Sequence, residues 1–169
     1  MIQPLSLKAL TRNEARILET VAGRIFPTTD TPGAVEAGAI NYIDQALAGD
    51  YAMFLKSYRK GLREVDRHAR GSFGKKFIAL SDDERDAVLS DLEAGKVAQF
   101  KKGTEFFAML RCHVLEGVFC EPDYGGNRGL IGWRLVGFPG QQFGYPDPYI
   151  NKAVDLSPVA AVEEKLEGD

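Results

Sequence analysis

The chain has 169 residues, of which 44% are hydrophobic and 27% are charged, a balance that is typical of a folded globular domain and excludes wholesale disorder. Its 21 Lys and Arg residues against 24 Asp and Glu residues give a net charge of −3, which excludes a protein whose main partner is the phosphate backbone of nucleic acid. No run of apolar residues is long enough to cross a bilayer, so we expect no membrane-spanning segment in this sequence.

The first part of the chain predicts two helices joined by a loop. Residues 11–14 have the pattern of a capping box and open the first helix, which ends near Phe26 because the following proline lacks the amide that a helix needs. Residues 27–33 form the loop. Thr31 is then the expected N-cap of a second helix, which begins at the next proline and ends at Gly49.

Three more helices follow, each with apolar residues at intervals of three and four. The third covers residues 51–71 and ends at a glycine, the fourth follows a capping box at residues 81–84, and the fifth runs from Thr104 to about Phe119. Pro122 bars any extension of the fifth helix. Its expected core-facing stripe comprises Phe107, Leu110, Val114 and Val118.

The character of the sequence changes after the fifth helix. Residues 123–127 combine glycines with an asparagine, which predicts a turn, and residues 130–136 predict a short helix. Residues 140–158 hold aromatic residues and prolines without periodicity, and residues 159–166 are expected to form one last helix. No stretch alternates in the manner of a strand.

These patterns predict an all-α fold. An irregular domain of about five to seven helices spans residues 1–139, and an extended C-terminal arm spans residues 140–169. The helices already have apolar stripes of their own, so the helical core does not depend on the aromatic side chains of the arm. Because protein interfaces are enriched in aromatic residues, packing of the arm on a partner protein and packing on its own helices stay equally open.

One cluster of chemically versatile side chains lies on the fifth helix and comprises Cys112, His113, Glu116 and Cys120. Adjacent turns of one helix cannot surround a zinc ion with four ligands, so ordinary helix packing explains the cluster better than a metal site does. Cys112 and Cys120 are separated by about 12 Å along a helix, which is too far for a disulfide. Neither histidine follows a glutamate by three residues, which excludes the repeated motif of a di-iron bundle.

Three segments resemble one known family. Residues 25–44 open with IFPTTDTPGA, Gly61 and Asp66 match the middle of the family pattern, and residues 105–140 contain PDYGGN and end in GFPG. The last segment is long and specific. Together the segments resemble subunit 3 of gluconate 2-dehydrogenase, the small-subunit family of that membrane-linked enzyme, and they cover most of the sequence before the arm.

The resemblance implies a role rather than a reaction. Members accompany a large flavin subunit of the glucose–methanol–choline oxidoreductase type, which oxidises sugars or sugar derivatives and passes electrons toward a haem (cytochrome c) subunit or another acceptor. FAD is therefore expected in the partner, and this chain is expected to bind no cofactor and no metal. The implied function is that of a non-catalytic subunit that stabilises the large flavoprotein and helps to export it.

The localisation stays open at this point. The family's small subunit usually carries a twin-arginine leader to the periplasm, whereas this sequence has no two adjacent arginines. Its first ten residues also lack the basic flank and apolar stretch of a secretion leader. Either a leader has been removed, or this member works in the cytoplasm.

The expected partner interface lies toward the C-terminal end. Tyr124, Asn127 and Trp133 are expected to hold the glycine turn in shape, while the arm from Phe138 to Pro158 is expected to lie on the catalytic chain. The full set of expected interface residues is Tyr124, Asn127, Trp133, Phe138, Phe143, Tyr145 and Tyr149.

A second class of function also stays open. The chain is then an independent helical enzyme or a small-ligand-binding protein that uses Cys112, His113 and Glu116. For the accessory subunit, and not for this alternative, Asp30 and Asp44 are expected polar anchors, and helix or turn capping explains Asp30 equally well.

Overall fold

The computed structural model describes residues 7–140 and confirms the all-α prediction. In this part of the chain six α-helices are joined by four short 3₁₀ turns, and no strand forms. The α-helices are α1 (Arg12–Ile25), α2 (Ala39–Ala48), α3 (Leu55–Phe73), α4 (Asp82–Glu93), α5 (Gly103–Phe119) and α6 (Ile131–Val136). None of these helices combines the length and hydropathy that crossing a membrane requires. The predicted arm and the predicted helix at 159–166 lie outside the described residues.

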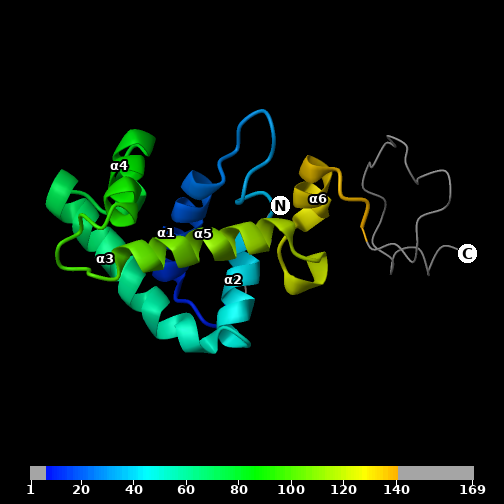
Figure 1. The fold of residues 1–169 in the computed structure, drawn as a ribbon, viewed down its shortest axis with the longest axis horizontal. Helices are drawn as coiled ribbons and strands as arrows, with labels where there is room; N and C mark the ends of the chain where they lie inside the picture. The colour runs from blue at the N-terminus through cyan, green and yellow to red at the C-terminus, as the bar shows by residue number, and fades with distance from the viewer. Residues whose placement is uncertain (1–6, 141–169) are drawn as a thin grey trace, which may run out of the picture.

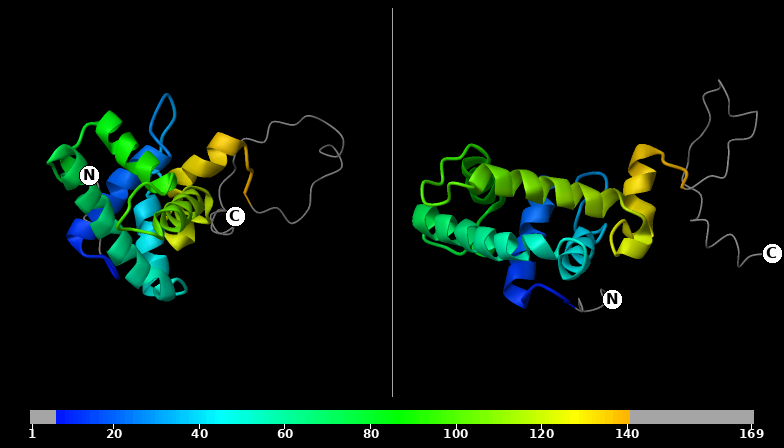
Figure 2. Two further views of the ribbon diagram at one scale, coloured as in Figure 1. Left: turned by 60° about the vertical axis from the view of Figure 1, so that its left-hand side comes forward. Right: turned by 60° about the horizontal axis from the view of Figure 1, so that its bottom comes forward.

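Helix α5 is the centre of the domain, and it contacts all five other α-helices. Helix α4 and the C-terminal part of α3 lie toward the N-terminal end of α5, while α6 lies at its opposite end (Figures 1 and 2). Helix α2 packs on the C-terminal half of α5, where Ala39 touches the backbone at Gly117. The last third of α5 is therefore the place where α2, α6 and the turns before α6 come together.

The core is built from the predicted apolar stripes, with one change on α5. Three of the four predicted positions are completely buried: Leu110, Val114 and Val118. The fourth core position is Phe106, whereas Phe107 is only partly buried. The Phe106 ring occupies the space that a side chain at Gly61 would fill, so the glycine in α3 lets the two helices approach closely.

Both predicted capping boxes form. Thr11 Oγ1 accepts the Glu14 amide at 3.3 Å, and Glu14 Oε2 accepts the Thr11 amide at 2.9 Å. Ser81 and Glu84 make the same exchange at 3.3 and 2.8 Å. Each pair satisfies two amides that the first turn of a helix leaves without partners, so α1 and α4 begin where the sequence predicts.

The predicted start of the second helix is wrong. Helix α2 begins at Ala39 and not at Pro32, because the chain first turns back on α1. The Ala34 amide donates to the Phe26 carbonyl at 2.8 Å, which closes the loop that follows α1. Gly38, with φ +71°, then redirects the chain into α2.

The predicted end of the third helix is also wrong. Helix α3 continues through Gly71 and ends at Gly74, which has φ +69°. A glycine inside a helix costs stability but does not by itself end the helix, whereas the left-handed backbone at Gly74 does. At its other end, α3 is preceded by a 3₁₀ turn, η1 (Ala52–Phe54), instead of starting at residue 51.

Candidate functional site

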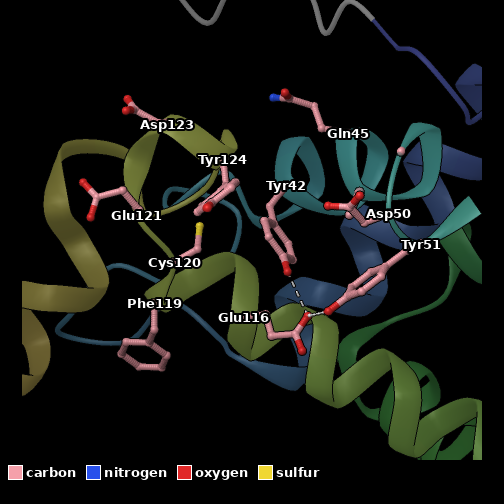
Figure 3. A pocket seen from close by; sticks show the side chains of 12 residues that line it. Tyr42, Gln45, Asp50, Tyr51, Glu116, Phe119, Cys120, Glu121, Asp123 and Tyr124 are labelled. Atoms are coloured by element: carbon pink, nitrogen blue, oxygen red, sulfur yellow. Dashed lines mark hydrogen bonds between the residues drawn. The ribbon is translucent and has the colours of Figure 1, made fainter.

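An open groove of about 630 Å³ lies where α2 and the segment before α3 face the C-terminal end of α5. Figure 3 shows Tyr42 and Tyr51 on one side pointing toward Glu116, while Cys120 and Tyr124 lie on the other side. Because α2 and α5 are packed together beneath it, the groove sits on a rigid part of the domain.

Glu116 is the centre of a hydrogen-bond network on this groove. Its Oε2 accepts the hydroxyls of Tyr42 at 3.0 Å and Tyr51 at 3.2 Å, and its Oε1 accepts the Cys112 thiol at 3.4 Å. Burial, together with the bonds to Tyr51 and Glu116, raises the pKa of Tyr42 far above its ordinary 10. The Tyr42 hydroxyl therefore stays protonated and holds the carboxylate as a donor.

His113 lies behind this network and is 6% exposed. A hydrogen bond of 2.9 Å joins its Nδ1 to the hydroxyl of Tyr58. Its ring stacks on that of Tyr51 with a centroid distance of 4.6 Å. Burial lowers the pKa of His113, and the nearby charge of Glu116 opposes this shift only in part. His113 thus supports the tyrosines from within the core.

The histidine predicts a specific pH dependence of stability. Because the folded-state pKa lies below the ordinary 6.5, the unfolded chain binds a proton that the folded chain does not as the pH falls below about 6.5. The contribution of His113 to stability is therefore complete above that pH and is lost below it. We expect His113→Gln, whose amide can still hydrogen-bond to Tyr58 and does not titrate, to flatten the fall in unfolding free energy between pH 7 and pH 5 in urea titrations. Equal slopes for both proteins would contradict the assignment.

The two cysteines show no sign of activation. Burial raises the pKa of the Cys112 thiol, and the adjacent Glu116 carboxylate raises it further. Burial also raises the pKa of Cys120. A reactive cysteine needs the opposite shift, because the thiolate is the nucleophile. Both cysteines are free, and within residues 7–140 no three His, Cys, Asp or Glu side chains converge as a metal ion would require.

The second wall of the groove is a tight turn that ends in Asn127. It begins with the 3₁₀ turn η3 (Pro122–Tyr124) and continues through Gly125. Asn127 adopts a left-handed backbone with φ +43° and is completely buried. Its Nδ2 donates to the carbonyl of Cys120 at 2.8 Å, and its Oδ1 accepts the Gly132 amide at 2.8 Å. One side chain thus joins the end of α5 to the start of α6.

The predicted interface residues occupy two different environments. Tyr124 is 64% exposed on the rim of the groove, and Phe138 is 40% exposed beyond α6. Asn127 and Trp133 are buried in their own chain, and Trp133 Nε1 donates to the Phe119 carbonyl at 2.9 Å. The remaining predicted residues lie outside the described part of the chain: Phe143, Tyr145 and Tyr149.

The two aspartates that the sequence suggests as anchors also differ. Asp44 is buried in α2 and accepts three backbone amides from the segment before α1. Asp30 is exposed in the loop after α1 and accepts the hydroxyl of Thr29 at 2.9 Å. Asp44 is therefore an anchor within the fold, and Asp30 takes part in a local turn.

Sequence reasoning missed the two tyrosines that contact Glu116. Tyr42 and Tyr51 are 74 and 65 residues away from it along the chain, so no motif spacing connects them. The one available signal is that both are tyrosines on or next to an otherwise apolar helix face, where a buried hydroxyl requires a polar partner.

Comparison with protein families gives one match. A family model described as gluconate 2-dehydrogenase subunit 3 matches residues 12–140. Neither the curated proteins nor the solved structures that were compared gave a match. The matched region begins with α1 and ends just beyond α6, so it contains the whole helical domain and both walls of the groove.

Proposed function

The chain belongs to the gluconate 2-dehydrogenase subunit 3 family, and from this we propose that it is a non-catalytic small subunit that binds and stabilises a large FAD-dependent oxidoreductase. The observation that carries the proposal is the family match itself, which spans every described helix. The large subunit is proposed to be of the glucose–methanol–choline type and to act on sugars or sugar derivatives. It would hold the FAD, and a cytochrome c subunit would be a further partner.

The chemistry of the groove supports an accessory role. Its central carboxylate, Glu116, is held by two tyrosine hydroxyls, and its neighbour Cys112 has a raised thiol pKa. His113 is turned toward Tyr58 and Tyr51 in the interior. These residues stabilise one another, and this arrangement suits recognition better than nucleophilic catalysis.

Export of the flavoprotein together with this chain is also part of the proposal. A small subunit that packs on the folded large subunit would protect it and accompany it through a pathway that accepts folded complexes. Stabilisation by binding requires only that the small subunit prefers the folded flavoprotein to the unfolded one.

The alternative class, an enzyme or ligand binder acting alone, is favoured by one observation: the groove has a volume within the range of small-molecule sites. The two functions differ in what the isolated chain does. An autonomous enzyme turns over a substrate, or an autonomous binder retains a ligand, without a second protein.

Co-expression tests the proposed function. The tagged full chain is expressed alone and together with the large flavoprotein subunit of the same genome, and each preparation is purified through the tag. We expect flavin absorbance and dye-linked sugar dehydrogenase activity only in the co-expressed preparation, in which both chains elute as one complex. Purification of the tagged chain without the flavoprotein would refute the proposal, and turnover or bound ligand in the isolated chain would favour the alternative.

A further inference from the structure

The groove beside Glu116 carries an unusual balance of charge. Four carboxylates line it, from Asp50, Glu116, Glu121 and Asp123, and no lysine, arginine or histidine of the described residues does. Within residues 7–140, Asp50 and Asp123 are exposed and take part in no ion pair. The exposed carboxylates of Asp50 and Asp123 therefore give this concave surface a negative potential.

Aromatic rings make up much of the remaining surface. Tyr42 and Tyr51 lie on one side of Glu116 and Tyr124 lies toward the other, whereas the Phe119 ring points away from them and packs on Phe26 (Figure 3). Aromatic faces attract ammonium and guanidinium groups, so rings and carboxylates together favour an organic cation. Glu116 adds to this, because its Oε1 has only the thiol of Cys112 as a described partner and retains capacity to accept hydrogen bonds.

The acids are spread around the groove rather than gathered on one point. Within the described part of the chain no three of them converge as ligands of a metal ion. A nearby cation, Lys8, contacts the lining through its ammonium, which donates to Gln45 Oε1 at 3.2 Å. Lys8 does not itself line the groove. The space thus fits an elongated cationic side chain entering from outside.

Resting on the proposed function, we propose that this groove receives a lysine or arginine side chain of the large flavoprotein subunit. Its position supports a protein occupant, because the groove opens on the surface beside Tyr124, which is 64% exposed. The exposed Phe138 lies at the same end of the domain, because Trp133 donates to the Phe119 carbonyl and its ring centroid is 4.9 Å from that of Phe138. Arginine against tyrosine, with a carboxylate beneath, is a combination typical of the strongest contacts in protein interfaces.

The test removes charge from the rim without touching the interior. Asp50→Asn together with Asp123→Asn replaces two exposed side chains that have no described hydrogen bond, so the fold is preserved. The matched control is Asp83→Asn with Glu105→Gln, which removes the same charge from the first turns of α4 and α5. Glu105 lies about 16 Å along α5 from Glu116. Each tagged full chain is co-expressed with the large subunit, and the captured flavoprotein per small chain is measured at low and high salt.

We expect the rim variant to capture at least about fivefold less flavoprotein than the control at low salt, with a smaller dependence on salt. Asp50→Lys with Asp123→Lys should reduce capture further, because it places like charges against the incoming cation. Equal capture by rim variant and control would overturn this inference while leaving the proposed function intact. Failure of the wild-type chain to capture flavoprotein would overturn both. Self-association of the isolated wild-type chain that the rim variant abolishes would assign the groove to a second copy and would likewise overturn the inference.

Discussion

Replacement of Asp44 by alanine is expected to lower the free energy of unfolding by about 3 kcal/mol, because hydrogen bonds to a charged acceptor contribute about 1.5–3 kcal/mol each and are only partly additive. The carboxylate is 2% exposed in α2. It accepts the backbone amides of Lys8 at 2.6 Å, Ala9 at 3.1 Å and Leu10 at 2.8 Å. Alanine would leave three donors without their acceptor, and the Leu10 amide among them is buried.

Urea unfolding and thermal melting measure this effect. For a chain of this size, about 3 kcal/mol corresponds to a melting temperature lower by roughly 6–12 °C. Asp44→Asn serves as the matched control, since its amide keeps one acceptor oxygen and should lose less stability than alanine. A loss below about 1 kcal/mol for Asp44→Ala would contradict the anchoring role, because a single neutral hydrogen bond already contributes that much.

The position of Asp44 connects this anchor with the groove. The next residue, Gln45, lines the groove and accepts the ammonium of Lys8. The amides that Asp44 holds belong to the same short segment as Lys8. Loss of the anchor would therefore free the segment that borders the groove, and its effect on partner binding would be an effect of positioning rather than of charge.

Local features of the fold could be predicted from the sequence. The capping boxes at Thr11 and Ser81 determine helix starts through contacts that span three residues, and both form. The errors arise where distant contacts decide. Thr31 followed by proline is a good helix start by itself, but the bond from the Ala34 amide to the Phe26 carbonyl closes a loop there instead. Likewise Phe106 rather than its neighbour turns inward because Gly61, on another helix, makes room for its ring.

The candidate site was less accessible to sequence reasoning than the fold. The spacing from Cys112 singles out Glu116 in the sequence, yet the main partners of Glu116, Tyr42 and Tyr51, come from elements far away in the chain. Periodicity predicts which face of a helix is buried, but it does not predict which side chain of another helix meets that face. The glycines predict the turn at residues 123–127, whereas the two side-chain bonds of Asn127 that hold it appear only in the structure.

Replacement of Asn127 by alanine is expected to cost about 3–4 kcal/mol, because one buried and one part-buried hydrogen bond are lost and alanine pays about 1 kcal/mol for the left-handed backbone. The side chain is completely buried between the Cys120 carbonyl and the Gly132 amide, and its φ is +43°. Among the described residues, no other side chain bonds to the Cys120 carbonyl or to the Gly132 amide. Asn127→Gly separates the two costs, since glycine tolerates the backbone and still loses both bonds.

The response to Asn127→Ala should begin locally, because the turn joins α5 and α6 at one end of the domain. Trp133 is the only tryptophan in the chain and is 5% exposed next to this turn, so a red shift of its emission reports the opening. Faster exchange of the Gly132 amide, which Asn127 Oδ1 accepts, reports it independently. The same turn carries Tyr124 and Asp123 on the groove. We therefore expect Asn127→Ala to reduce capture of the flavoprotein more than Asn127→Gly does, because glycine adopts the left-handed backbone without strain. Unchanged emission and exchange in the alanine variant would show that the contacts of Trp133 hold the turn without Asn127.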